Sequence, residues 1–225
     1  MTDQLTGINF DVNASTYKGV KNSEFLYFYK NFDPRCESLV RIVKYFNIKH
    51  RIIGSGLGQH FNSYTTVLMV VFFLQSRDIL PSVASLQDNV PEDICEGANF
   101  AFDKERRSSS ANSQSIMELL LEFFQFYAEF DFSTAMICPL IGSTVVKEEI
   151  FRQDEVVVRD PFEAVFFTLI GRGMSRLGSH WSRASLVMLA PTILYHKEPA
   201  RGFGTQNTPQ WVVGGFGCTS WFFMA

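Results

Sequence analysis

A chain of 225 residues is long enough for one large domain or two small ones, and 46% apolar with 19% charged residues excludes a wholly disordered protein. The net charge of −3 excludes bulk attraction to nucleic acid, so any RNA contact must use a local basic patch. The four cysteines form no C-x-x-C pair, which argues against a zinc site and for reduced thiols inside a cell.

The chain changes character after Glu163. Of the 23 acidic residues, 22 lie at or before this position, together with 15 of the 20 basic residues. The remainder, 164–225, shows no long helical or alternating period, and we expect an irregular, divergent tail. The apolar run at 66–74 is too short to span a membrane, and the first residues have no features of a secretory signal or a mitochondrial presequence.

The first predicted element is a strand within residues 6–15. Ile8, Phe10 and Val12 alternate with polar residues, which is typical of a half-buried strand. Asp11 lies on the polar face. The pattern fits a solvated carboxylate or one that holds a metal ion or a proton, and does not decide between them.

Two helices are expected next. Asn22 or Ser23 can cap the first, and Asp33 followed by Pro34 is a strong start signal for the second. Apolar residues recur at helical spacing along the second helix, and Lys44 lies at the edge of this stripe.

The glycine-rich stretch at 54–58 is expected to be a flexible loop, because it lacks the spacing of a phosphate-binding motif and follows a helix. Asn62 or Ser63 then caps an apolar helix that runs to Gln75. The segment 79–87 predicts a turn with a short helix.

Residues 88–112 are polar and rich in serine, and 105–113 is expected to be a flexible loop. The clearest helix of the chain follows at 113–130, and 155–163 predicts a short strand that runs into a proline turn.

Other candidate sites are weaker. Glu129 and Asp131 are two apart, as in a metal site, but the end of an amphipathic helix favours solvated carboxylates. The four histidines have no partner at ligand spacing. The basic stretch KERR at 104–107 is interpreted as solvated surface.

Five stretches in this order resemble the template-independent RNA nucleotidyltransferases, the family of poly(A) RNA polymerases and terminal uridylyltransferases. They are TGINFDV, KNSEFLYFYKNFDPRCESLVRIVKYF, NSYTTVLMVVFFLQ with ILPSVASLQ, NSQSIMELLLEFFQFYAEFDF and VVRDPFE. The resemblance covers about residues 4–163 and is greatest to the mitochondrial poly(A) polymerase branch.

The resemblance implies a catalytic role for Asp11. In the family, a strand of this form carries the third carboxylate of a site for two divalent ions, Mg²⁺ or Mn²⁺. Hard cations of this kind prefer oxygen ligands. With the family in view, the metal-site interpretation of Asp11 is favoured over the solvated one.

The resemblance also implies residues that bind the substrate, ATP or UTP. Asn22 matches the residue that contacts the ribose, with Ser23 beside it, and Lys44 matches a lysine that meets the triphosphate. The remaining matches are Ser63 for phosphate, Tyr64 for stacking on the base, and Asp160 and Glu163 near the base edge. For Lys44, Tyr64 and Asp160 the alternatives are a surface lysine, a core aromatic and an Asp-Pro turn residue.

The implied fold is α+β and mainly helical: the central domain of a polymerase-beta-like nucleotidyltransferase with one palm-type strand. We expect a palm remnant at 1–16, a nucleotide-binding central domain at 17–163 and the divergent tail at 164–225. The family's Gly-Ser loop and D-x-D pair precede the third carboxylate. They are absent from the ten residues before Asp11, and Lys21 replaces the family's histidine.

We therefore expect a fragment or isoform of an RNA 3′-terminal nucleotidyltransferase that is inactive or nearly so by itself. The alternative is a non-catalytic protein that binds nucleotide or RNA or pairs with another subunit. The implied partners are an RNA 3′ end and a nucleoside triphosphate, with a homodimer as a further hypothesis and no membrane partner. The branch suggests the mitochondrion, with the cytoplasm or nucleus as alternatives.

Overall fold

The computed structural model describes residues 4–6, 16–50, 52, 62–108, 110–151 and 156–163, and the backbone of 167–170. The predicted strand at 6–15 lies outside the described residues except for Thr6, which belongs to a turn. Asp11 is also outside them, so its role remains a prediction.

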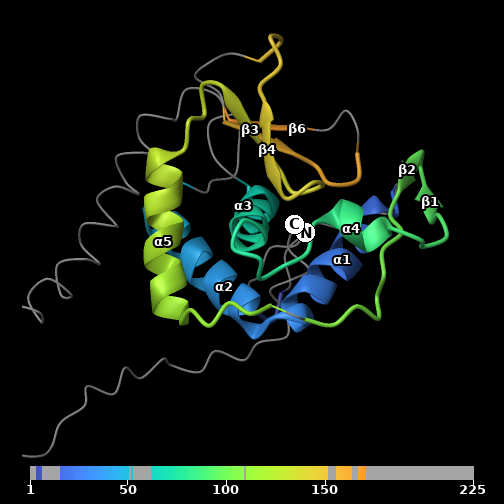
Figure 1. Cartoon of the computed structure of the whole chain (residues 1–225), viewed down its shortest axis with the longest axis horizontal. Helices are drawn as coiled ribbons and strands as arrows, with labels where there is room; N and C mark the ends of the chain where they lie inside the picture. Colours follow the sequence, from blue (N-terminus) through green and yellow to red (C-terminus); the bar gives the residue numbers. More distant parts are fainter. Residues whose placement is uncertain are drawn as a thin grey trace, which may run out of the picture.

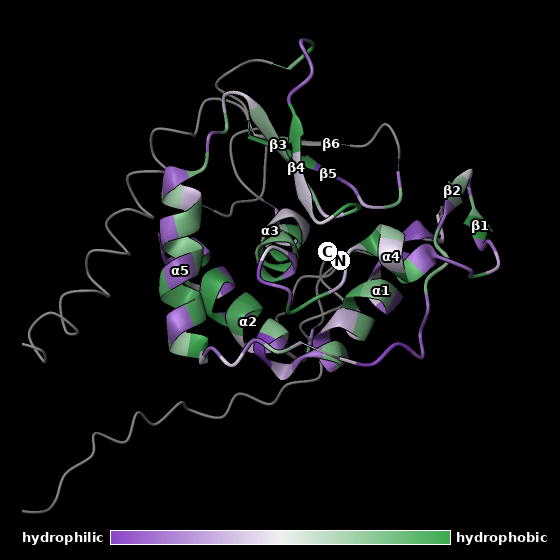
Figure 2. Cartoon of the chain, viewed as in Figure 1, coloured by the Kyte–Doolittle hydropathy of each residue, from purple (hydrophilic) through white to green (hydrophobic). Residues whose placement is uncertain are grey.

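Helix α3, Ser63–Gln75, lies at the centre of the molecule (Figure 1). Helices α2, Pro34–Lys49, and α5, Ile116–Glu129, pack against it, and the larger sheet covers it from another side. Every residue of α3 from Thr65 to its end is buried. A helix surrounded in this way is apolar on all faces, as Figure 2 shows, and the predicted buried helix is confirmed.

Helix α1, Lys18–Phe32, begins earlier than predicted, so Asn22 and Ser23 are inside the helix and do not cap it. The residues before the helix are held by a distant carboxylate. Glu96 accepts hydrogen bonds from the Thr16 hydroxyl (2.8 Å) and from the next backbone N–H (3.1 Å). A tertiary contact therefore sets the start of this helix, and no local cap reveals it.

The predicted caps of α2 and α3 are confirmed. The Asp33 carboxylate accepts from the backbone N–H of Arg35 at 2.9 Å, with Pro34 in the first turn. Of the two candidates for α3, Asn62 is the cap, because its side-chain oxygen accepts from the backbone N–H of Thr65 at 2.7 Å.

The predicted short helix is α4, Val83–Gln87. The polar stretch after it holds an unpredicted hairpin, β1, Ile94–Cys95, with β2, Ala98–Asn99. The predicted long helix is α5, which begins with a capping box between Ser115 and Glu118.

Part of the segment expected to be a flexible loop, 105–113, makes specific contacts. The guanidinium of Arg35 donates to the backbone and side-chain oxygens of Asn112 and to the backbone carbonyl of Gln114, each at 3.0 Å. Three charge-assisted hydrogen bonds from one side chain fix the end of the loop before α5.

The larger sheet has the strand order β4-β3-β5-β6. Its strands are β3, Ala135–Cys138, β4, Ser143–Val146, β5, Val156–Arg159, and β6, Phe167–Ile170. β3 pairs antiparallel with β4 and parallel with β5, and β5 pairs antiparallel with β6. Strand β5 confirms the strand expected within 155–163.

Strand β6 lies inside 164–225, where the sequence has no long period and an irregular tail is expected. Four residues are too few for a pattern to be recognised, and pairing with β5 supplies the backbone partners that define the strand.

The turn after β5 joins the sheet to α1. The ring of Phe162 lies 4.8 Å from that of Phe25 in α1 and 4.7 Å from that of Phe100, measured between centroids. The aromatic core thus fixes residues 160–163 against α1. No helix within the described residues is long and apolar enough to cross a membrane.

Candidate functional site

The turn at residues 160–163 carries two of the predicted site residues, Asp160 and Glu163. Asp160 is buried, and its Oδ1 accepts the backbone N–H groups of Phe162 (2.9 Å) and Glu163 (3.1 Å). Its Oδ2 accepts the hydroxyl of Tyr64 at 3.0 Å. Asp160 therefore shapes the turn, as an Asp-Pro turn residue would, and also connects the turn to the first turn of α3.

The Tyr64–Asp160 pair is held in a poorly solvated place. Burial raises the pKa of the Asp160 carboxyl, although the three hydrogen bonds that it accepts work in the opposite direction. Burial, together with the charge of Asp160, raises the pKa of Tyr64 well above its usual value. The phenol therefore remains a donor at neutral pH and fixes the orientation of its half-buried ring.

Lys18 is a site residue that the sequence interpretation missed. Its Nζ lies 3.1 Å from Oε2 of Glu163, and this hydrogen bond raises the pKa of the lysine. Lys18 precedes Asn22 by four residues, the spacing of neighbours on one helix face. With the helix start known, this spacing would have placed Lys18 beside the predicted residue.

Asn22 lies between Lys18 and Phe25 on one face of α1, and both of these contact the 160–163 turn. This places Asn22 on the face toward the turn. Its Oδ1 is buried and has no hydrogen-bond partner among the described residues. A buried acceptor of this kind is costly unless a ligand or water satisfies it.

Two neighbouring side chains are engaged elsewhere. The Ser23 hydroxyl donates to the backbone carbonyl of Gly19 at 2.8 Å, within its own helix. Lys21, at the position of the family's histidine, forms an ion pair with Asp93, just before β1. The contacts of these two polar groups therefore lie away from the 160–163 turn.

The start of α3 supplies donors. Ser63 and Tyr64 are its first residues and both are half-buried. Their backbone N–H groups have no acceptor within the helix, because the first turn never does. Together with the helix dipole, they make this end favourable for an anion.

Lys44 belongs to α2, one turn before Asn47, whose amide nitrogen lies 3.5 Å from the hydroxyl of Thr66 in the first turn of α3. The lysine is half-buried, and burial lowers its pKa. No ion pair of Lys44 is found within the described residues. A bound anion nearby would offset the cost of burying this ammonium group.

The site thus joins the first half of α1, the start of α3 and the turn after β5. No group of three histidine, cysteine or acidic side chains able to hold a metal ion occurs in the described part of the chain. Glu129 and Asp131 are exposed, as expected from their position at the end of α5. An aromatic platform beside a helix N-terminus, with a lysine and an open amide, suits a phosphorylated ligand that carries a base.

Comparisons with known proteins identify relatives of this chain. Residues 115–165 match the model of the Cid1 family of poly A polymerases. The chain is 29% identical over 214 residues to the speckle targeted PIP5K1A-regulated poly(A) polymerase of Xenopus tropicalis, covering 86% of this chain and 25% of that protein. It is 31% identical over 167 residues to the mitochondrial poly(A) RNA polymerase of Mus musculus, covering 71% and 28%.

Solved structures show the same fold. Mitochondrial poly(A) polymerase in its apo form has a TM-score of 0.76 at 23% identity, covering 88% of this chain and 44% of that one. The Cid1 terminal uridylyl transferase has a TM-score of 0.63 at 23% identity, covering 75% and 56%.

The fold is that of the polymerase-beta-like nucleotidyltransferases. The chain belongs to the template-independent poly(A) polymerase and uridylyltransferase family. It spans about a quarter to a third of the length of the curated relatives named above and of their GLD2-A counterpart in Xenopus laevis. The similarity to the Xenopus tropicalis protein covers 86% of the chain. Residues 1–163 are a smaller share than this, so the similarity includes part of 164–225.

Proposed function

We propose that this chain is the nucleotide-binding part of an RNA 3′-terminal nucleotidyltransferase, with ATP or UTP as the ligand. Tyr64 offers its ring to the base, and Asn22 offers its open Oδ1 to a ribose hydroxyl. The start of α3, with the hydroxyl of Ser63, accepts the phosphates, and Lys44 contributes positive charge.

The observation that carries the proposal is the hydrogen bond between Tyr64 and Asp160 beside a buried, unpartnered oxygen of Asn22. Both oxygens of Asp160 already accept hydrogen bonds, so we assign it a positioning role toward Tyr64. The second carboxylate oxygen of Glu163 accepts no hydrogen bond from the described residues, and Glu163 is the carboxylate we assign to the base edge.

In the relatives, structures with UTP and with ATPγS bound have been solved, for mitochondrial poly(A) polymerase. This supports a triphosphate ligand for the present chain. A divalent ion, Mg²⁺ or Mn²⁺, would supply activation of the RNA hydroxyl and neutralise the phosphates, with Asp11 as the ligand that the family resemblance implies.

The 225-residue polypeptide holds one carboxylate that matches the family's metal site, and two-metal chemistry needs more. We therefore expect that this polypeptide binds nucleotide and does not extend RNA, whatever longer protein it belongs to. The chemistry assigned to its own residues is binding and orientation of the triphosphate.

The test is calorimetric titration of the purified chain with ATP and with UTP, alongside an RNA tailing assay. Tyr64→Ala is expected to weaken binding roughly ten-fold, because stacking of a base on an aromatic ring contributes about 1–3 kcal/mol. The matched control is Tyr45→Ala, which removes a ring that is 66% exposed on α2. Equal loss in both variants, or no binding by the unaltered chain, contradicts the proposal, and robust tailing contradicts the expected inactivity.

For the compartment we propose the mitochondrion, on the strength of the mitochondrial relatives from Mus musculus and Homo sapiens. The name of the Xenopus tropicalis relative points to nuclear speckles as the competing location. Fractionation of cells that express the tagged protein separates the two.

A further inference from the structure

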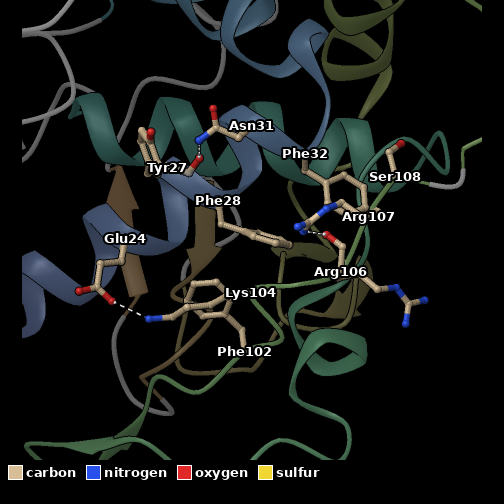
Figure 3. Close-up of a pocket in the computed structure, with 10 residues that line it drawn as sticks. All are labelled: Glu24, Tyr27, Phe28, Asn31, Phe32, Phe102, Lys104, Arg106, Arg107 and Ser108. Atoms are coloured by element: carbon tan, nitrogen blue, oxygen red, sulfur yellow. Dashed lines mark hydrogen bonds and ion pairs between the residues drawn. The ribbon is translucent and has the colours of Figure 1, made fainter.

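A pocket of about 470 Å³ lies along α1, next to the face that contacts the 160–163 turn, and Figure 3 shows the residues that line it. One wall is α1 itself and the other is the segment 102–108. The lining residues are Glu24, Tyr27, Phe28, Asn31, Phe32, Phe102, Lys104, Arg106, Arg107 and Ser108. This volume lies within the usual range for ligand sites, about 300–1,000 Å³.

Aromatic rings form the floor of the pocket. Phe28 and Phe102 pack with their centroids 5.2 Å apart, so they form a rigid surface. Tyr27 is 60% exposed at the edge. An exposed ring beside a fixed apolar floor offers a face on which a planar group can stack.

Three cations and one carboxylate line the same pocket. Lys104 pairs with Glu24 at 3.3 Å, which leaves the two arginines as the net charge. Arg107 is largely exposed; it pairs with Glu105 at 3.2 Å, a contact of little strength in water, and donates to the backbone carbonyls of Glu105 (2.7 Å) and Arg106 (3.3 Å). The exposed Arg106 side chain extends away from the aromatic rings in Figure 3, and its guanidinium has no hydrogen bond or ion pair in the described part of the chain.

We infer that this pocket binds single-stranded RNA upstream of the 3′ end. Bases stack against Tyr27 and Phe28, and Arg106 and Arg107 meet the phosphates. Nucleobases stack on aromatic rings and on guanidinium planes alike, and phosphates favour arginine. A peptide would have to be acidic to use the same cations, and nothing in the pocket provides the backbone pairing that an extended peptide uses.

The inference deepens the proposed function, on which its choice of RNA rests. The pocket and the candidate nucleotide site share α1, whose residues 22 and 31 are about 14 Å apart along the helix axis. One RNA chain can therefore reach from the start of α1 to the pocket in a few nucleotides. The segment KERR, interpreted from sequence as solvated surface, becomes part of the RNA path.

The experiment measures fluorescence anisotropy of a labelled single-stranded oligo(A) RNA of about 15 nucleotides, a length near the upper site size of such proteins. The variants are Arg106→Ala with Arg107→Ala, and Tyr27→Ala. The controls are Arg41→Ala with Lys49→Ala, which removes two exposed charges on α2, and Tyr45→Ala.

We expect the arginine pair to weaken RNA binding at least ten-fold, and Tyr27→Ala several-fold, with no change in the controls. The logarithm of the RNA association constant falls as the logarithm of the salt concentration rises, and the loss of two phosphate contacts should make this slope less steep by about 1.4. RNA binding that is unchanged in both pocket variants, or equally reduced in the controls, overturns the inference, as does absence of RNA binding by the unaltered chain.

A parallel titration with ATP separates the two proposals. The arginine variant should bind ATP like the unaltered chain, since these residues lie outside the candidate nucleotide site. If ATP binding is absent throughout while the arginine pair still controls RNA binding, the nucleotide proposal fails and the RNA pocket stands.

Discussion

A tyrosine hydroxyl forms a hydrogen bond near each end of α3: that of Tyr64 at the start and that of Tyr29, from α1, at the end. The two hydrogen bonds serve different purposes. At the end of α3, Gln75 donates to the backbone carbonyls of Pro81 and Pro139, each at 3.0 Å, and to the hydroxyl of Tyr29 at 3.1 Å. Tyr29 in turn donates to Pro81 at 2.6 Å. These side chains are buried, so the network locks α1 and two loops onto α3.

At the start of α3, Tyr64 donates to Asp160 and is only half-buried. Within the described residues, the amide oxygen of Gln75 at the end of α3 lacks a partner, and so do those of Asn22 and of the buried Asn47 nearer the start of α3. Exposure is what differs: Gln75 is buried, whereas Asn22, Ser63 and Tyr64 all retain accessible surface. The comparison teaches that the enclosed Tyr29 hydrogen bond stabilises the fold, whereas the Tyr64 hydrogen bond orients a ring that keeps accessible surface and that we propose as the ligand platform.

The largest effect is expected from a substitution in the buried network of Tyr29 and Gln75 at the end of α3. Tyr29→Ala removes a fully buried ring and its hydroxyl, and we expect the free energy of unfolding to fall by about 3–5 kcal/mol. Urea denaturation followed by circular dichroism measures it. Tyr45→Ala on the surface of α2 should change it by about 0.5 kcal/mol or less. A similar loss in free energy of unfolding in the two variants would mean that the Tyr29 network does not stabilise the fold.

The comparison is sharpened by removing only the hydroxyls. Tyr29→Phe removes one hydrogen bond at the Pro81 carbonyl and one at the Gln75 amide, which both keep other partners, and should cost about 1 kcal/mol of stability, with ATP affinity unchanged. Tyr64→Phe removes the donor to the buried Asp160 carboxylate, should cost about 1–3 kcal/mol of stability, and should lower ATP affinity because the ring loses its fixed orientation. Denaturation and calorimetry on the same samples check both; an affinity loss in Tyr29→Phe alone would reverse the assignment.

A pH dependence of the free energy of unfolding is expected from Asp160. Its pKa is raised in the folded chain above the ordinary value of 3.8, so the folded state binds more protons between the two values. The free energy of unfolding therefore decreases as pH rises through this window, and the loss is complete above the folded pKa. Asp160→Asn removes this contribution. Subtracting its pH profile from that of the unaltered chain should give a difference that declines as pH rises from about 3.8; a difference that grows would contradict the direction.

The smallest effect concerns Lys18. Lys18→Gln should change stability little, since the ion pair with Glu163 is partly exposed and screened by solvent. The same change frees the Glu163 carboxylate, so the ratio of ATP to UTP affinity should shift. Glu163→Gln is the matched variant, because it removes the other charge of the pair. An unchanged ratio in both variants would exclude Glu163 from contact with the base.

Much of the helical part could be predicted from sequence because its signals are local. Asp33 with Pro34, Asn62 and Ser115 each occur next to the apolar run that they start. The start of α1 could not be predicted, because the carboxylate that anchors it belongs to Glu96, far along the chain. Strands β3 and β4 escaped prediction for a related reason: each has four residues, and strand pairing rather than pattern defines them.

The candidate site also has a part that could be predicted from the sequence and a part that could not. Resemblance to a family selected Asn22, Ser23, Lys44, Ser63, Tyr64, Asp160 and Glu163, and the structure connects Tyr64 to Asp160 and places Asn22 on the helix face toward their turn. It turns the Ser23 hydroxyl inward to its own helix and adds Lys18. These two changes depend on where α1 begins and on what approaches it.

The amino-acid sequence by itself determined the helices that carry their own caps, the apolar central helix and the order of motifs that marks the family. Caps and periodicity involve atoms within a few residues of one another, so they can be read along the chain. Only the tertiary structure decided which side chains share the 160–163 turn and which basic residues face the rings of α1. Those pairings join residues up to 145 positions apart, and burial and charge act through space rather than along the sequence.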